Sequence, residues 1–442
     1  MAETAGVAYG FETLVEGALA AVKGIYDPTL PLKATSTPVG GIGLYRAHHS
    51  LATRNGRAYI FGGVTVGGNG QTELADNAMH IVILPSSGVE SADYRRIEPT
   101  TESPPARCGH SCALIDERMY LYGGSAKDSG ELLNEQGRVW VYDTSTDKWS
   151  HLDPPEGAVT PTPRAEHASI GSEHPKNETR PTDEGSLPQQ PPDPASVVPE
   201  PAAPDTYGTL IIQGGKGKEG DHNDMWTFDI SSRTWAELPE PPPPRSESPS
   251  LALVDRRIYS FSGGQVSYLD LAKGAFNDMG GSGELGLVPL GPWSSIPPTS
   301  SSPDKPPPAE RTGACLMPVT TGQGRNYLLL LGGRTPTGEA LDDIWALQLK
   351  PEGMTAASFK DAAREAINKN TREAEWDEVK YYNSEGKMIQ EGQDGRGLGG
   401  RRDFAVVKGS EVDGATVVVW GGRSTAADGK LFGDGLMISV DR

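Results

Sequence analysis

The chain has 442 residues, a formal net charge of −19 and a pI near 4.9. An acidic chain repels phosphate backbones, so the charge argues against nucleic-acid binding as the main role. Three cysteines are too few, and odd in number, for a disulfide framework. No apolar run reaches the roughly 18 residues of a membrane span, and the N-terminus lacks the basic start of a signal peptide. These features predict a cytoplasmic protein, with the nucleus left open.

Residues 1–28 are predicted to form an N-terminal helical segment. The helix is expected over 9–23, where apolar side chains recur on one stripe: Phe11, Leu14, Val15, Ala18, Leu19 and Val22. Such a stripe packs against the rest of the chain or serves as a docking or dimer surface, and the sequence leaves both open.

From residue 29 onward the chain is dominated by an internal repeat. Six short runs rich in β-branched, aliphatic and aromatic residues each end in two glycines. The pairs are Gly62 and Gly63, Gly123 and Gly124, Gly214 and Gly215, Gly263 and Gly264, Gly332 and Gly333, and Gly421 and Gly422. This pattern predicts a strand that turns sharply where side chains do not fit.

Other strands surround each glycine pair. An arginine opens the preceding strand, at Arg46, Arg107, Arg164, Arg245, Arg311 and Arg402. A third strand follows each pair, and an aromatic residue marks a fourth at Tyr94, Trp149, Trp235, Trp293 and Trp376. The unit is therefore strand, strand with two glycines, strand, and strand with an aromatic.

This unit resembles the kelch repeat, and the resemblance covers about residues 30–442. It implies an all-β, six-bladed propeller with four-stranded blades around a channel. The sixth unit ends after its third strand, so residues 29–37 are predicted to supply its fourth strand and close the ring. The propeller domain is thus expected over 29–442.

Three insertions interrupt the repeat. Residues 172–206 are Pro-rich and polar, which predicts a disordered loop. Residues 272–291 are expected to form a glycine-rich loop, and 355–375 to form a helix with Phe359 and Ile367 on its apolar stripe.

Three histidines follow an arginine at the same spacing: His49, His110 and His167. They suggest bonds between neighbouring blades more than a metal cluster, because buried polar groups need partners. The same interpretation applies to the six arginines, with a ligand site facing the channel as the alternative.

Glu73, Asp76 and His80 are the candidate metal ligands, since two carboxylates and a histidine suit Fe(II). They resemble the Glu-xxx-Asp-xxx-His iron motif of plant specifier proteins, which are kelch proteins, but the first spacing is one residue shorter. The resemblance implies a metal-dependent enzyme or specifier protein as the alternative function. The other interpretation is an ordinary polar lead-in to the third strand, and no catalytic set or cofactor is predicted.

The leading hypothesis is a protein-interaction scaffold. Lys216, Arg334 and Arg423 each follow a glycine pair, at equivalent positions of the repeat. Loops after the glycine pair commonly form the binding face of kelch propellers. Basic side chains there would favour an acidic segment of a protein partner. The alternative is that they are solvated loop charges, and the sequence indicates no oligomeric state.

Overall fold

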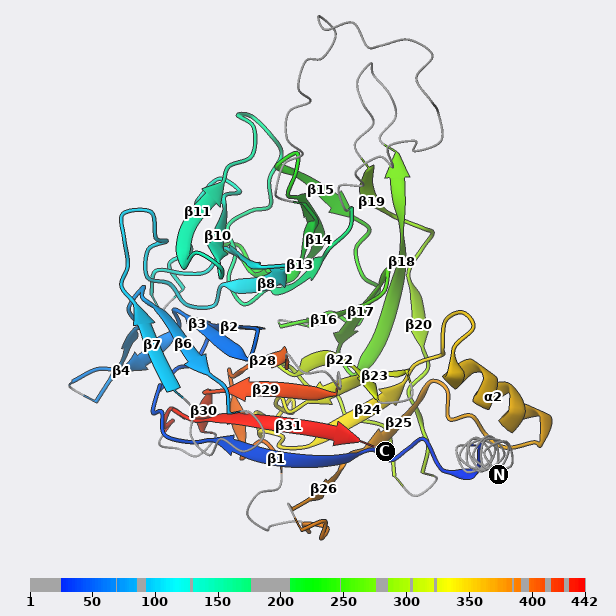
Figure 1. The fold of residues 1–442 in the computed structure, drawn as a ribbon. Coiled ribbons are helices and arrows are strands. Elements are labelled where there is room, and N and C mark those ends of the chain that lie inside the picture. Colours follow the sequence, from blue (N-terminus) through cyan, green and yellow to red (C-terminus); the bar gives the residue numbers. More distant parts are fainter. Residues whose placement is uncertain are drawn as a thin grey trace, which may run out of the picture.

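The computed structural model describes residues 25–68, 70–85, 93–127, 130–175, 207–246, 248–275, 285–302, 305–321, 324–383, 385–390, 397–409, 415–424 and 429–441. Six sheets stand as blades around a central channel, which confirms the predicted propeller (Figure 1). In this part of the chain no helix is long and apolar enough to cross a membrane. The predicted helix at 9–23, and residues 176–206 of the predicted disordered insertion, lie outside the described residues.

The first three blades have four strands each, and the innermost strand comes first along the chain. Blade 1 contains β2 (Ser50–Arg54), β3 (Arg57–Phe61), β6 (Met79–Ile83) and β7 (Asp93–Ile97). Blade 2 contains β8 (Ser111–Ile115), β9 (Arg118–Tyr122), β10 (Val139–Asp143) and β11 (Lys148–Leu152). Blade 3 contains β12 (Ala168–Ser172), β13 (Thr209–Lys216), β14 (Asp221–Asp229) and β15 (Thr234–Leu238).

The other three blades carry additional strands. Blade 4 contains β16 (Ser250–Val254), β17 (Arg257–Ser262), β18 (Gln265–Ala275), β19 (Leu285–Pro289) and β20 (Ser294–Ile296). Blade 5 contains β21 (Thr299–Ser300), β22 (Cys315–Thr321), β23 (Arg325–Leu331), β24 (Ile344–Gln348) and β25 (Glu375–Glu378). Blade 6 contains β1 (Lys33–Val39), β26 (Lys380–Tyr382), β28 (Ala405–Lys408), β29 (Thr416–Trp420) and β31 (Gly435–Asp441). Two small ladders complete the described strands: β4 (Val64–Val66) with β5 (Thr72–Leu74), and β27 (Arg401–Arg402) with β30 (Arg423–Ser424).

The N-terminal strand closes the ring, as predicted. Strand β1 pairs antiparallel with β31 in blade 6, in a register that runs from Lys33 opposite Asp441 to Val39 opposite Gly435 (Figure 1). Blade 6 therefore contains strands from both ends of the chain, and the backbone pairing between them joins residues about 400 positions apart.

Each glycine pair lies at the end of the second strand of a blade or directly after it, and in blades 1, 2 and 6 the first glycine lies too close to the next blade for a side chain. Gly62 has a φ of +63°, and a Cβ atom there would lie 2.5 Å from the backbone oxygen of Arg107 in blade 2. Gly123 repeats this arrangement, with its Cβ position 2.6 Å from the oxygen of Arg164 in blade 3. Only glycine combines this backbone conformation with this spacing.

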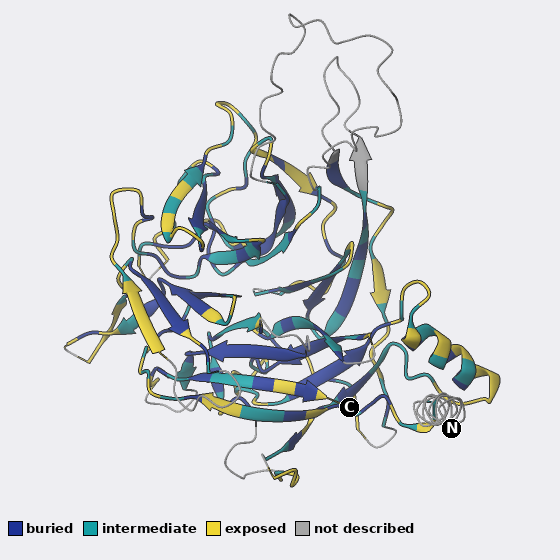
Figure 2. Cartoon of the chain, viewed as in Figure 1, coloured by how far each residue is buried: buried dark blue, intermediate teal, exposed yellow. Residues whose placement is uncertain are grey.

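Apolar side chains fill the spaces between neighbouring blades. The second and third strands, such as β3, β23 and β29, are almost entirely buried, whereas outer strands such as β7 face solvent (Figure 2). One cluster joins blades 5 and 6 and includes Leu329, Val417 and Val419. The inner strands contact one another around the ring and line the channel.

The helix predicted at 355–375 is shorter, and its buried face is not the apolar one. Helix α2 (Ala356–Ala366) begins at a capping box between Thr355 and Ser358. Phe359 is 67% exposed, whereas Asp361 is buried. The reason is Arg325, a buried arginine of β23 that donates two hydrogen bonds to Asp361, at 2.8 and 2.6 Å. A buried guanidinium requires a carboxylate, and this requirement sets the orientation of the helix.

The segment 272–291 is also not a simple loop. Strands β18 and β19 pair from Leu271 opposite Pro289 to Ala275 opposite Leu285 and extend the hairpin of blade 4. The prediction of a glycine-rich loop is therefore wrong for both ends of this segment, while residues 276–284 lie outside the described part.

Candidate functional site

A buried arginine clamps the turn after the second strand in four blades: Arg107, Arg164, Arg311 and Arg401. In blade 3, Arg164 Nη1 donates to the backbone oxygen of Gly214 at 3.0 Å and to Asp224 Oδ1 at 2.6 Å. Arg164 Nη2 donates to Asp224 Oδ2 at 2.8 Å, and the Trp226 indole donates to the same carboxylate. Because all partners belong to one blade, the expectation that these arginines bond between blades is wrong.

The clamp departs from the predicted arginines in three blades. In blade 1, Arg46 contacts Asp76 and His80 instead of the glycine turn. In blade 6 it is Arg401, not Arg402, that reaches the glycine turn at Gly421. In blade 4, Arg245 is exposed and contacts Glu240 instead. Arg401 therefore forms the clamp of blade 6, and Arg402 lines the cavity at the channel mouth.

Two of the three histidines, His110 and His167, form hydrogen bonds between neighbouring blades, as predicted. His110 Nε2 lies 2.9 Å from Ser50 Oγ of blade 1, and His167 Nε2 lies 2.7 Å from Ser111 Oγ of blade 2. Burial lowers the pKa of His167 to about 3, so its imidazole is neutral. His49 has no hydrogen-bond partner for either ring nitrogen among the described residues, and its pKa is likewise lowered to about 3.

The residues after the glycine pairs stand beside the clamp. Lys216, Arg334 and Arg423 each follow the second glycine of a pair. Backbone bridges join each of them to the residue after the clamp arginine of its own blade, namely Ala165, Thr312 and Arg402. The repeat therefore sets all three at the same height, at one mouth of the channel.

A cavity of about 150 Å³ opens at this mouth. Its charged lining comes from blades 1, 3, 5 and 6: His48, Glu166, Lys216, Arg334, Arg402 and Asp403. Lys216 and Arg334 thus share one cavity. Arg423 does not line it, but its Nε atom lies 3.7 Å from Oδ2 of Asp403, which does. Four basic side chains, counting Arg423, face two acidic ones here, in a chain whose net charge is strongly negative.

Asp403 is the centre of the charge network at the mouth. Its Oδ2 lies 3.3 Å from His48 Nε2 and 3.8 Å from Arg402 Nη1. Burial by itself raises the pKa of Asp403, but His48, Arg402 and Arg423 outweigh it and lower the pKa to about 2. Burial also lowers the pKa of His48, and Asp403 more than compensates, so the net pKa of His48 is raised above 6.5.

The candidate metal ligands do not gather into a site. Asp76 and His80 do meet, with His80 Nε2 2.9 Å from Asp76 Oδ1. Arg46 Nη2 lies 2.9 Å from the same Asp76 oxygen and 2.8 Å from His80 Nε2, and His80 Nδ1 contacts the Tyr94 hydroxyl. A guanidinium already occupies the atoms that would bind a cation. Over the described ranges, no three His, Cys, Asp or Glu side chains are placed to hold a metal ion.

Sequence reasoning missed three charged residues of the mouth, His48, Glu166 and Asp403, while Arg402 corresponds to the channel-facing alternative considered for the repeat arginines. The sequence does contain a signal for them, because His48 stands two positions after Arg46 and Glu166 stands two positions after Arg164, the equivalent arginines of their repeats. Counting from Arg401, Asp403 takes the same position, and its φ of +57° matches those of His48 and Glu166. The equivalence is not apparent when Arg402 is taken as the repeat arginine, because Asp403 then stands one position after it and not two.

The comparisons with known proteins agree with this architecture. A family model described as the KLHDC2/KLHL20/DRC7 Kelch-repeats domain matches residues 33–175. The chain carries kelch repeats. An F-box/kelch-repeat protein of Arabidopsis thaliana is 25% identical over 70% of this chain and 58% of its own length. The human Rab9 effector protein with kelch motifs is 24% identical over 42% of this chain and 41% of its own length.

Other similarities are more distant. Tip elongation aberrant protein 3 of Schizosaccharomyces pombe is 22% identical over 44% of this chain. The chain spans 16% of that relative's length, so it resembles only part of a much longer protein. A solved structure described as that of YjhT aligns over 91% of this kelch chain and 99% of the other, with 14% identity and a TM-score of 0.48.

Proposed function

We propose that this kelch-repeat chain is a protein-interaction scaffold whose channel mouth binds an acidic segment of a partner. The observation that carries the proposal is the local excess of positive charge: Lys216, Arg334, Arg402 and Arg423 against Glu166 and Asp403. Charge complementarity of this kind guides a partner to one face and fixes its orientation. The kelch relatives include the human Rab9 effector, whose name describes a role with another protein.

The cavity at the mouth suits a side chain better than a whole small ligand. Its volume of about 150 Å³ lies below the roughly 300–1,000 Å³ of typical small-molecule pockets. An extended acidic peptide crossing the mouth would place one carboxylate in the cavity and others against the surrounding basic side chains. Lys216 and Arg334 are half-buried, so a hydrogen bond from each to a carboxylate would be partly shielded from water.

The experiment selects random peptides on the purified full chain and measures the affinity of the selected peptides by fluorescence anisotropy. We expect selected peptides enriched in Asp and Glu. Each charge-assisted hydrogen bond is worth about 1.5–3 kcal/mol, so combining Lys216→Ala, Arg334→Ala and Arg423→Ala should weaken binding at least about 100-fold. A matched variant that removes exposed lysines outside the mouth, Lys148→Ala, Lys350→Ala and Lys387→Ala, should retain the affinity.

Two results would count against the proposal. One is a selection that yields peptides without acidic enrichment. The other is an unchanged affinity in a triple variant whose unfolding temperature equals that of the wild type.

A further inference from the structure

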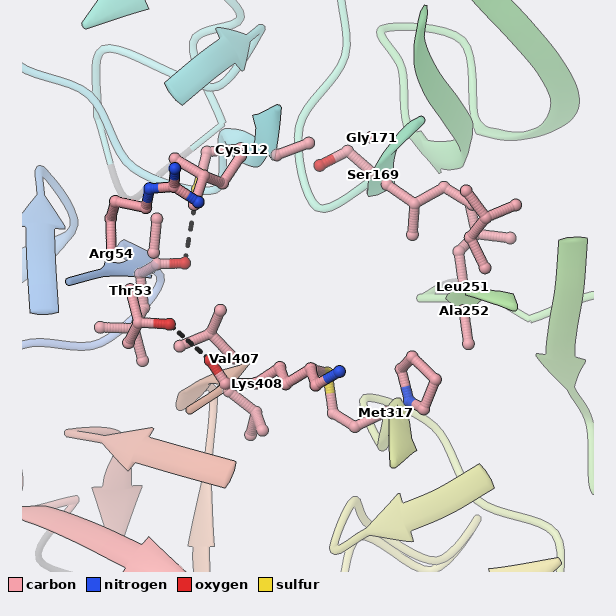
Figure 3. Close-up of a pocket in the computed structure, with 18 of the residues that line it drawn as sticks. Thr53, Arg54, Cys112, Ser169, Gly171, Leu251, Ala252, Met317, Val407 and Lys408 are labelled. Atoms are coloured by element: carbon pink, nitrogen blue, oxygen red, sulfur yellow. Dashed lines mark hydrogen bonds between the residues drawn. The ribbon is translucent and has the colours of Figure 1, made fainter. Parts of the chain in front are cut away.

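The channel has a second, larger cavity at the end opposite the basic mouth. Its volume is about 530 Å³, within the range of pockets that bury a small organic molecule. All six inner strands line it, as the labelled side chains around the opening show (Figure 3). It continues toward the histidines through Ser169, Leu251, Met317 and Val406, which also line the neighbouring part of the channel.

The wall of this cavity is largely apolar. Each blade contributes an aliphatic side chain or a methionine: Leu51, Leu114, Ile170, Leu253, Met317 and Val406. All but Leu51 are partly exposed, although they belong to the innermost strands of the fold. Apolar surface that remains accessible inside a concave site is the usual environment for the body of a small ligand.

The cations of this cavity differ in their surroundings. Arg54 is held by Glu117, at 2.9 Å from Nε, and by Asp116, at 3.6 Å from Nη2. The Lys408 ammonium has no hydrogen bond or ion pair with any residue in the described ranges. Its side chain extends from β28 across the opening, toward the side where Met317 lies (Figure 3). Lys408 is thus a positive charge at the entrance of an apolar cavity.

We infer that this end of the channel binds a small amphipathic anion, with its apolar body between the inner strands and its carboxylate or sulfonate on Lys408. The ion pair requires an anionic group because Lys408 offers only donors. The apolar body supplies most of the binding free energy through burial, and the ion pair fixes its orientation. This site lies at the far end of the channel from the proposed protein-binding mouth, so each can fail in experiments independently of the other.

The test uses the full chain with the fluorescent probe 8-anilinonaphthalene-1-sulfonate, which combines an aromatic body with a sulfonate. We expect saturable binding of one probe per chain and displacement by decanoate more readily than by 1-decanol, the matched neutral compound. Lys408→Ala should weaken decanoate about tenfold and leave 1-decanol unchanged. Lys148→Ala, which removes an exposed lysine from outer strand β11, should change neither.

A second variant tests the location. Met317→Trp adds bulk at a residue that lines both this cavity and the part of the channel beside the histidines, so it should reduce the affinity for both decanoate and 1-decanol. Equal displacement by decanoate and 1-decanol, or a decanoate affinity unaffected by Lys408→Ala, would overturn the inference. That pair of measurements decides the question even if the tryptophan variant is poorly folded.

Discussion

Ala405→Ser is expected to stabilise the propeller, because it supplies a missing bond between blades 6 and 1. His110 bonds Ser50, the first residue of inner strand β2 in the preceding blade. Ala405 is the first residue of inner strand β28, and like Ser50 it pairs with the residue just before a glycine pair. His49 packs against the glycine turn of blade 6 as His110 does against that of blade 1, so its ring is already in place.

The expected gain is about 1 kcal/mol in the free energy of unfolding, the typical net contribution of one hydrogen bond. The gain comes from satisfying a ring nitrogen of His49 that is buried without a partner among the described residues. Since the pKa of His49 is about 3, the imidazole stays neutral at pH 5–8 and the gain should not change across that range.

Urea denaturation followed by tryptophan fluorescence measures this gain, and a double-mutant cycle attributes it. His49→Phe is a suitable background because Phe404 occupies the equivalent position in blade 6. In that background Ala405→Ser should give no stabilisation. Ser50→Ala, the reverse change, should cost about 1 kcal/mol. If Ala405→Ser is neutral, or stabilises equally without His49, the proposed equivalence of these positions is incorrect.

Two further predictions concern the clamp and the mouth. Arg164→Met should lower the free energy of unfolding by about 3–5 kcal/mol, because it leaves the half-buried Asp224 carboxylate without its cation. The control, Arg245→Met, replaces the exposed arginine of blade 4 and should change the free energy of unfolding by less than about 0.5 kcal/mol in the same urea titration. The His48–Asp403 ion pair stabilises the fold below about pH 6.5, and this contribution is lost as the pH rises through the raised pKa of His48. In acid, the contribution of Asp403 is lost between about pH 4 and pH 2, as its carboxylate becomes protonated. His48→Asn should therefore remove part of the fall in unfolding temperature between pH 5 and pH 8, and an identical pH profile in the two proteins would contradict the assignment.

The repeat made the fold predictable from the sequence. A glycine pair recurs in every blade, and at Gly62, Gly123 and Gly421 it marks a place where a Cβ atom would collide with the backbone of the next blade. Ring closure followed from counting strands, since the sixth unit lacked its fourth and Lys33–Val39 provided it.

The mouth was only partly predictable. The positions of Lys216, Arg334 and Arg423 follow from the repeat, because each is fixed by the backbone bridge beside its glycine pair. Their surroundings do not follow, because Asp403 and Glu166 reach them from other turns of the chain.

The sequence by itself determined the number of blades and the order of the repeated strands, since these depend on a pattern of glycine pairs and flanking strands that recurs along the chain. Only the tertiary structure decided between Arg401 and Arg402 as the clamp, because adjacent arginines are equivalent in a pattern and differ only in which one reaches Gly421. It also decided that α2 buries Asp361 rather than Phe359, and that Lys408 lies at an apolar channel. These outcomes depend on partners far apart in the chain, whose distances and burial no local pattern specifies.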